Sequence, residues 1–171
     1  MASNQKPVIV RRVSGDWLSG YANPRKLVVD GGLELLDQSG KVIALPLAEI
    51  KLASFVRDFG SPGDPAPEKL ARKTFAGRPR VAGLMVRITF KDGDMLEGMA
   101  ANDRTLLDNE GLLLTPPDLR SNVQRIYVPR LAIAELEIIS VIHPPKVRVQ
   151  RVANLQDDLF ANLPVSNSRL N

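Results

Sequence analysis

The residue types able to carry out chemistry in this sequence are carboxylates, basic side chains and one histidine. The chain has no cysteine, and its single histidine, His143, is followed by two prolines. A thiolate nucleophile, a thiolate metal site and a histidine-rich metal cluster are therefore excluded. The sequence also lacks GxSxG, GxxxxGK[ST] and a GxGxxG following a strand. These observations predict a protein that is not an enzyme and that holds no cofactor and no metal.

Carboxylates are concentrated in the second half, where residues 83–142 carry nine acidic and six basic side chains. Paired carboxylates are able to exchange protons with a substrate or to bind a divalent cation. These side chains fall on predicted turns and exposed strand faces, so we interpret them as solvated. The carboxylates in question are Asp92, Asp94, Glu97, Asp103, Asp108 and Glu110.

Basic residues gather in a Pro/Gly-rich connector, residues 59–82, and in the tail that follows His143. The net charge is +4, and the connector alone carries five basic and two acidic residues. Such a surface is able to contact nucleic-acid phosphates. Aromatic residues make up only 5% of the chain, so platforms for base stacking are scarce. The predicted nucleic-acid surface consists of Lys69, Arg72, Lys73, Arg78, Arg80, Arg148 and Arg151.

An internal repeat indicates which elements position these side chains. VIVRRVSGDWLSGYA and VRITFKDGDMLEGMA share the pattern Gly-Asp-x-Leu-x-Gly, from Gly15 to Gly20 and again from Gly93 to Gly98. IALPLAEI, which begins at Ile43, then matches IYVPRLAI, which begins at Ile126. Because the pieces recur in the same order, the chain is predicted to contain two related units.

Each unit reads as a set of short strands. Val86, Ile88 and Phe90 alternate with polar residues, which is typical of a strand with one buried face. Gly15 and Gly93 lie in predicted tight turns, whereas Gly20 and Gly98 fall inside strands and indicate bends. We therefore expect an all-β fold of two tandem, five-stranded, strongly bent barrels. The expected divisions are a first unit (6–58), a connector (59–82), a second unit (83–142) and a tail (143–171).

The connector and tail are each predicted to contain a short helix. Asp64 and Pro65 are suited to begin one that runs to Lys73, and Phe75 is expected to pack the connector against a barrel. In the tail, apolar side chains recur at helical spacing and form one stripe. That stripe either packs on its own unit, the interpretation we favour, or docks on a partner. It consists of Leu155, Leu159, Phe160 and Leu163.

The second unit, through VRITFKDGDMLEGMAAND, GLLL and RIYVPRLAIAELEII, resembles the Sm-like (LSm) family of small β-barrels. The first unit resembles it through VIVRRVSGDWLSGYA and IALPLAEIKLASFV. The resemblance covers about residues 7–57 and 84–142. It implies small barrels that assemble into rings and an RNA pocket whose Asp matches Asp103. The Arg-Gly of that pocket is replaced by Pro129-Arg130-Leu131 in the second unit and by Pro46-Leu47 in the first, which weakens the implied RNA binding.

FKDGDMLEG, LLTPPDLRSNVQRIYV and ASFVRDF also resemble a group of uncharacterised bacterial proteins, some of which accompany PilZ domains that bind cyclic dinucleotides. In a PilZ site, two arginines four residues apart clamp phosphate, followed by Asp-x-Ser-x-x-Gly. Here Arg11 and Arg12 are adjacent, and Asp37-Gln38-Ser39-Gly40 brings the glycine too early. Cyclic-dinucleotide sensing by Arg11 and Arg12 is therefore the least favoured alternative.

The sequence thus favours a non-enzymatic binding or scaffold module that pairs strand edges with a protein partner or a second copy, giving a homo-oligomer or ring. RNA or single-stranded nucleic-acid binding through the basic residues is the alternative. The chain lacks a run of about 20 apolar residues and a secretory signal, so we expect a soluble, cytoplasmic protein without membrane contact.

Overall fold

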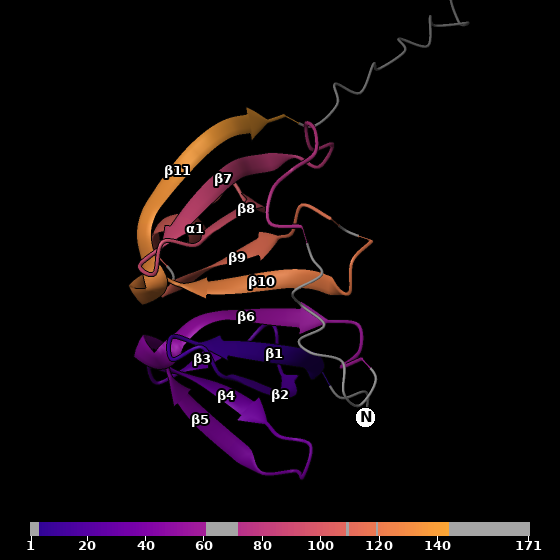
Figure 1. The fold of residues 1–171 in the computed structure, drawn as a ribbon, viewed down its shortest axis with the longest axis vertical. Helices are drawn as coiled ribbons and strands as arrows, with labels where there is room; N and C mark the ends of the chain where they lie inside the picture. Colours follow the sequence, from indigo (N-terminus) through magenta and orange to yellow (C-terminus); the bar gives the residue numbers. More distant parts are fainter. Residues whose placement is uncertain (1–3, 61–71, 109, 119, 144–171) are drawn as a thin grey trace, which may run out of the picture.

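The computed structural model describes residues 4–60, 72–108, 110–118 and 120–143, whose regular secondary structure is almost entirely β-strand (Figure 1). The prediction of an all-β fold is confirmed. The strands of the first half are β1 (Lys6–Arg12), β2 (Trp17–Ala22), β3 (Val28–Val29), β4 (Gly32–Leu36), β5 (Val42–Pro46) and β6 (Ile50–Val56). Those of the second half are β7 (Gly83–Phe90), β8 (Met95–Ala100), β9 (Gly111–Thr115), β10 (Val123–Pro129) and β11 (Ile133–Ile142).

Helical structure in the described residues is limited to single turns. A 3-10 turn, Leu47–Glu49, joins β5 to β6, and another, Arg130–Ala132, joins β10 to β11. A short helix, α1 (Thr105–Asp108), precedes β9 and was not expected from the sequence. The alternation that predicted β7 is confirmed, since Val86 and Ile88 are fully buried while Arg87 between them is half-buried.

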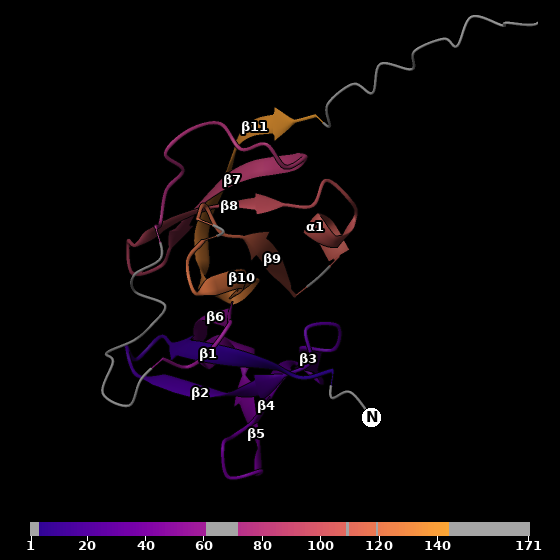
Figure 2. The same cartoon turned by 90° about the vertical axis from the view of Figure 1, so that its right-hand side faces the viewer.

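All strands join one antiparallel sheet in the order β11-β7-β8-β9-β10-β6-β1-β2-β4-β3, with β5 paired to β4. β5 covers one edge of β4 from Gly32 to Leu36, so β2 and β3 share the other edge. Among the described strands, β5 pairs only with β4, and β11 pairs only with β7. Figures 1 and 2 show these two strands at opposite ends of the molecule, with β6 and β10 side by side in the middle.

The two halves have the same strand order: β6-β1-β2-β4-β5 in the first corresponds to β11-β7-β8-β9-β10 in the second. Their registers correspond as well, because Val8 pairs with Gly20 and Val86 pairs with Gly98. Even a β-bulge recurs, at Lys51 in β6 and at its repeat counterpart, Ala134, in β11. The pairing within each half is therefore the one that the internal repeat predicts.

Two closed barrels, however, are not confirmed, because the pairings form one open sheet. The reason lies in β6, whose two edges pair with β1 and with β10. Since a strand has only two edges, β6 is not available to close the first half on itself. We call the β6–β10 pairing, which joins residues 53–56 to residues 123–127, the inner seam.

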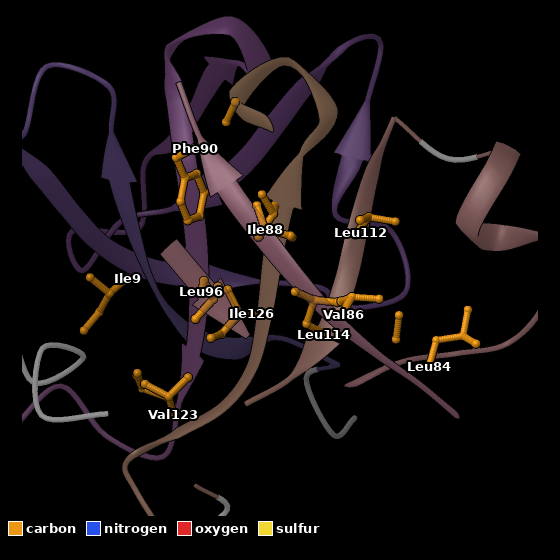
Figure 3. Packing of buried hydrophobic residues seen from close by; sticks show 14 residues of the cluster. Ile9, Leu84, Val86, Ile88, Phe90, Leu96, Leu112, Leu114, Val123 and Ile126 are labelled. Atoms are coloured by element: carbon orange, nitrogen blue, oxygen red, sulfur yellow. The ribbon is translucent and has the colours of Figure 1, made fainter. Parts of the chain in front are cut away.

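Buried apolar side chains form two clusters, and each half contributes to the cluster of the other. Ile9 and Val56, from the first half, lie in the cluster built mainly on β7 to β10; Figure 3 labels Ile9 among its side chains. Tyr127, from β10, lies in the cluster of the first half. The two repeats are therefore integrated through the cores as well as through the sheet.

Several predicted features lie outside the described residues. The connector helix expected from Asp64 falls largely within residues 61–71, and the tail helix falls within residues 144–171. Lys69, Arg148, Arg151 and the stripe of Leu155, Leu159, Phe160 and Leu163 belong to these segments.

Candidate binding site

A cavity of about 460 Å³ lies beside the inner seam. It is bordered by the β1–β2 turn, by β6, by the β7–β8 turn, by β10 and by the end of the connector. Its basic side chains are Arg11, Arg12, Lys51, Arg72 and Lys73, and its acidic side chains are Asp92 and Asp94. The cavity volume falls within the range of small-molecule sites in proteins, about 300–1,000 Å³.

The bulge in β6 is occupied by Lys51, whose side chain is only 14% exposed. Bulges redirect side chains, and here the ammonium group bonds to the carboxylates of Asp92 and Asp94, the latter at 2.7 Å. It also lies 5.1 Å from the centre of the Phe90 ring, a cation–π contact. These contacts connect the first half to the β7–β8 turn of the second.

The ion pairs at Lys51 alter the pKa values of all three groups. Burial lowers the pKa of Lys51, but the hydrogen bonds to the two carboxylates outweigh burial and raise it above its usual value. The hydrogen bond from Lys51 lowers the pKa of Asp92 and that of Asp94. The three groups are therefore charged across the neutral range.

Two equivalent turns shape the rim of the cavity. In the first, the Arg12 amide donates to the Asp16 carbonyl at 2.9 Å, and in the second, Phe90 donates likewise to Asp94 at 2.8 Å. Gly15 and Gly93 occupy the left-handed region, with φ of +95° and +85°, a conformation that glycine adopts without strain. The prediction of tight turns at both glycines is confirmed.

The end of the connector is held beside the cavity by Glu97 of β8. Glu97 is only 6% exposed, and its carboxylate accepts hydrogen bonds from Arg87, at 2.8 Å, and from the amide of Phe75, at 2.9 Å. The Glu97 amide in turn donates to the Lys73 carbonyl at 2.7 Å. A buried carboxylate of this kind needs such partners, and they fix the backbone that carries Arg72 and Lys73.

Replacing Lys51 with methionine is expected to lower the free energy of unfolding at neutral pH by about 1 kcal/mol. The figure is modest because Asp92 and Asp94 are half-exposed and their ion pairs are screened by salt. Because the pKa values of both carboxylates are lowered in the folded state, they stabilise the fold fully above their usual pKa of 3.8. This stabilisation is lost as the pH falls through their lower folded pKa values. Because the pKa of Lys51 is raised in the folded state, its stabilisation is fully present below pH 10.5 and is lost as the pH rises through its folded pKa.

Urea unfolding of the wild type and of Lys51→Met across the pH range measures this dependence. The difference between them should be largest at neutral pH and should shrink at acid pH below the folded pKa values of the carboxylates. Lys91→Met is the control, since Lys91 is exposed in the same turn. A difference that stays constant down to strongly acid pH would contradict the prediction.

The structure brings together part of the predicted basic set. Arg72 and Lys73 line the cavity, and they meet there with Arg11 and Arg12, which the sequence had assigned to a different hypothesis. Arg78 and Arg80 are exposed and lie outside the cavity lining.

Sequence reasoning missed the part that Lys51 plays. It also misjudged Glu97, whose interpretation as solvated is wrong because this side chain is buried. For Asp92 and Asp94 the same interpretation was incomplete, since both pair with Lys51. In the sequence, an acidic residue beside a Gly-Asp turn gives no signal of its ion-pair partner 41 or 43 residues away.

A second cavity, of about 510 Å³, has Tyr127 in its lining. The Tyr127 hydroxyl is buried and has no hydrogen-bond partner among the described residues. Burial raises the pKa of Tyr127 to about 12, with Glu110 adding to the rise and Arg130 opposing it.

In the described ranges, no group of three or more histidine or carboxylate side chains is placed to hold a metal ion. None of the described helices has the length and hydrophobicity to cross a membrane.

Residues 4–140 match the model of a family described as having unknown function. No curated protein and no solved structure matches the chain.

Proposed function

The chain belongs to the DUF6982 family, a family of unknown function, and from its geometry we propose that it is a non-enzymatic scaffold module that assembles head to tail with further copies of itself through strand edges. In this proposal each repeat acts as an Sm-like unit, as the sequence resemblance implies. The observation that carries the proposal is that the two outer strands, β5 and β11, are the repeat counterparts of the two strands paired at the inner seam.

The inner seam provides the template. There Arg125 pairs with Phe55, Ile126 with Ser54, and Tyr127 with Ala53. One edge of β10 thus pairs with one edge of β6. The chain therefore already contains one example of this contact.

Moving this register by the repeat spacing that relates Ile43 to Ile126 gives the expected contact between two copies. β10 becomes β5, and β6 becomes β11. The pair Arg125–Phe55 then becomes Val42 of one copy opposite Ile138 of the next. Two residues further along the strand, the pair Tyr127–Ala53 becomes Ala44 of one copy opposite Leu136 of the next.

The side chains at these edges favour pairing. Val42 is 61% exposed and Ile138 is 52% exposed, and the transferred register places them opposite each other. Strand edges that carry open hydrogen-bonding groups and exposed apolar side chains readily pair with another strand. A second copy supplies a strand of complementary register.

Because β5 and β11 lie at opposite ends of the molecule, each copy offers a different surface to each neighbour (Figure 1). Such a heterologous contact gives a ring if the rotation between copies closes and a filament if it does not. The Sm-like resemblance favours the ring.

The test uses two variants that each block one edge, Val42→Lys and Ile138→Lys. Light scattering after size exclusion should find the wild type oligomeric and each variant monomeric. An equal mixture of the two variants should form dimers, because the intact β11 of Val42→Lys fits the intact β5 of Ile138→Lys and both other edges are blocked.

Leu107→Lys serves as the control, since Leu107 is 80% exposed on α1 and belongs to neither edge. This variant should assemble like the wild type. A wild type that stays monomeric at millimolar concentration would rule out the proposal. So would a mixture of the two edge variants that remains monomeric.

A further inference from the structure

The cavity beside the inner seam combines a positively charged rim with an apolar floor. Five basic side chains and two acidic ones line it. The floor is formed by Leu52 of β6, Leu96 of β8, and Val123 and Ile126 of β10. We propose that this cavity binds a small phosphorylated molecule with an apolar body, the chemical class to which nucleoside phosphates belong.

The residues that the structure describes do not neutralise all of the positive charge at the rim. The two carboxylates of the β7–β8 turn pair with Lys51 and Lys73, and Arg12 pairs with Asp16 at 3.4 Å. Arg72, by contrast, has no ion pair with any residue that the structure describes. The Nε atom of Arg12 is buried and donates no hydrogen bond to the described residues. Phosphate accepts hydrogen bonds from guanidinium groups in parallel pairs, so Arg72 and the open N–H of Arg12 are suited to bind it.

These charges are not a by-product of the repeated fold. The repeat counterparts of Arg11 and Arg12 are Thr89 and Phe90, and the counterpart of Lys51 at the second bulge is Ala134. Since the same strands and bulge form with uncharged residues there, the fold does not require basic residues at these positions. The ion pairs of Lys51 join the two halves and account for that residue. Crowded charges also carry a desolvation and repulsion cost, so the gathering of further basic side chains around Lys51 favours a ligand.

The floor adds a requirement that free phosphate does not meet. Among the apolar lining residues, Leu52 is only partly buried and Val13 is 62% exposed, so the cavity keeps apolar surface that a ligand can cover. Covering it with an apolar body gains affinity in proportion to the area that is buried. A nucleoside places its base and sugar on such a floor while its phosphates reach the rim.

Binding would also link the two halves, because the lining comes from both. Arg11, Arg12 and Lys51 belong to the first half, while Leu96 and Ile126 belong to the second. A ligand that binds only the folded chain raises its melting temperature by mass action. This gives a readout that does not depend on self-assembly.

Isothermal titration calorimetry and thermal unfolding of the full chain test the inference, with ATP, GTP and cyclic di-GMP as nucleotide probes in magnesium-free buffer. Pyrophosphate is the probe that carries charge without an apolar body. At least one nucleotide should bind and raise the melting temperature, and pyrophosphate should bind about tenfold or more weakly. If pyrophosphate binds with the same affinity as the nucleotides, the assignment of the apolar floor is wrong. If no probe binds at millimolar concentration, the cavity is not a binding site of this kind.

Two double variants separate the cavity from general attraction to the basic connector. Arg72→Ser with Lys73→Ser removes two exposed rim residues and should weaken nucleotide binding about tenfold or more. Arg78→Ser with Arg80→Ser removes the same charge from outside the cavity and should leave binding unchanged. Equal losses of nucleotide affinity in the two double variants would overturn the inference, and so would a chain that binds single-stranded RNA through all four residues but binds no nucleotide. Either result would assign the connector to nucleic acid.

Discussion

Phe55→Ala is expected to lower the free energy of unfolding by about 3–5 kcal/mol. Phe55 is 2% exposed and lies on β6, where it pairs with Val8 of β1 on one side and with Arg125 of β10 on the other. Its ring fills the first-half cluster directly beside the inner seam. Truncation therefore leaves a cavity at the point where both halves meet, and the surrounding strands are not free to collapse into it.

Urea unfolding followed by far-UV circular dichroism measures this effect. Phe59→Ala is the matched control, because Phe59 is only partly buried and contacts Tyr21 edge-to-face at 5.4 Å between ring centres. It should cost less than half as much. If Phe55→Ala leaves too little folded protein to measure, Phe55→Leu should give an intermediate loss. Equal losses for Phe55→Ala and Phe59→Ala would contradict the packing described for β6.

Gly20→Ala is expected to cost about 2–3 kcal/mol, through overpacking. A Cβ atom at Gly20 would lie 2.5 Å from the Leu36 carbonyl oxygen and 2.8 Å from Cγ of Leu35. The carbonyl belongs to the neighbouring strand β4, so relief requires β2 and β4 to separate. The sequence predicted a bend at this glycine, and what the structure shows there is a close approach between strands.

The repeat supplies the control for this substitution. At Gly98, the counterpart of Gly20, a Cβ atom would lie 3.0 Å from Cβ of Leu114 and 3.2 Å from the Thr115 carbonyl oxygen. Small shifts relieve such contacts, so Gly98→Ala should lower the melting temperature less than Gly20→Ala. The reverse order would show that the close approach at Gly20 is not the limiting contact.

Much of each repeat could be predicted from the sequence because its signals are local. Alternation at Val86, Ile88 and Phe90 identifies a strand, and Gly-Asp identifies the turn after it. The pairing of β6 with β10 is different, because Ala53 and Tyr127 are far apart in sequence and an unpaired edge has no signature of its own. The sequence therefore predicted the content of both units but placed each in a closed barrel, where the structure has one open sheet.

The candidate site was predictable only in fragments. Arg11 with Arg12, and Arg72 with Lys73, each stood out as basic pairs, but they belonged to separate hypotheses. Their meeting depends on Glu97, which fixes the connector, and on the inner seam, which brings the two halves together. A glutamate in an alternating strand has the pattern of a solvated residue, and its burial follows from partners on other elements.

The exchange of core residues between the repeats has a consequence for the chain during its synthesis. When the first repeat has emerged from the ribosome, Ile9 and Val56 still lack the side chains that bury them, and one edge of β6 is open. At ordinary translation rates the ribosome adds Val123, which begins β10, about 3–13 s after it has added Val56. During that interval the nascent chain presents an unpaired strand to its neighbours on the same message, and it is then that we expect molecular chaperones to be needed most.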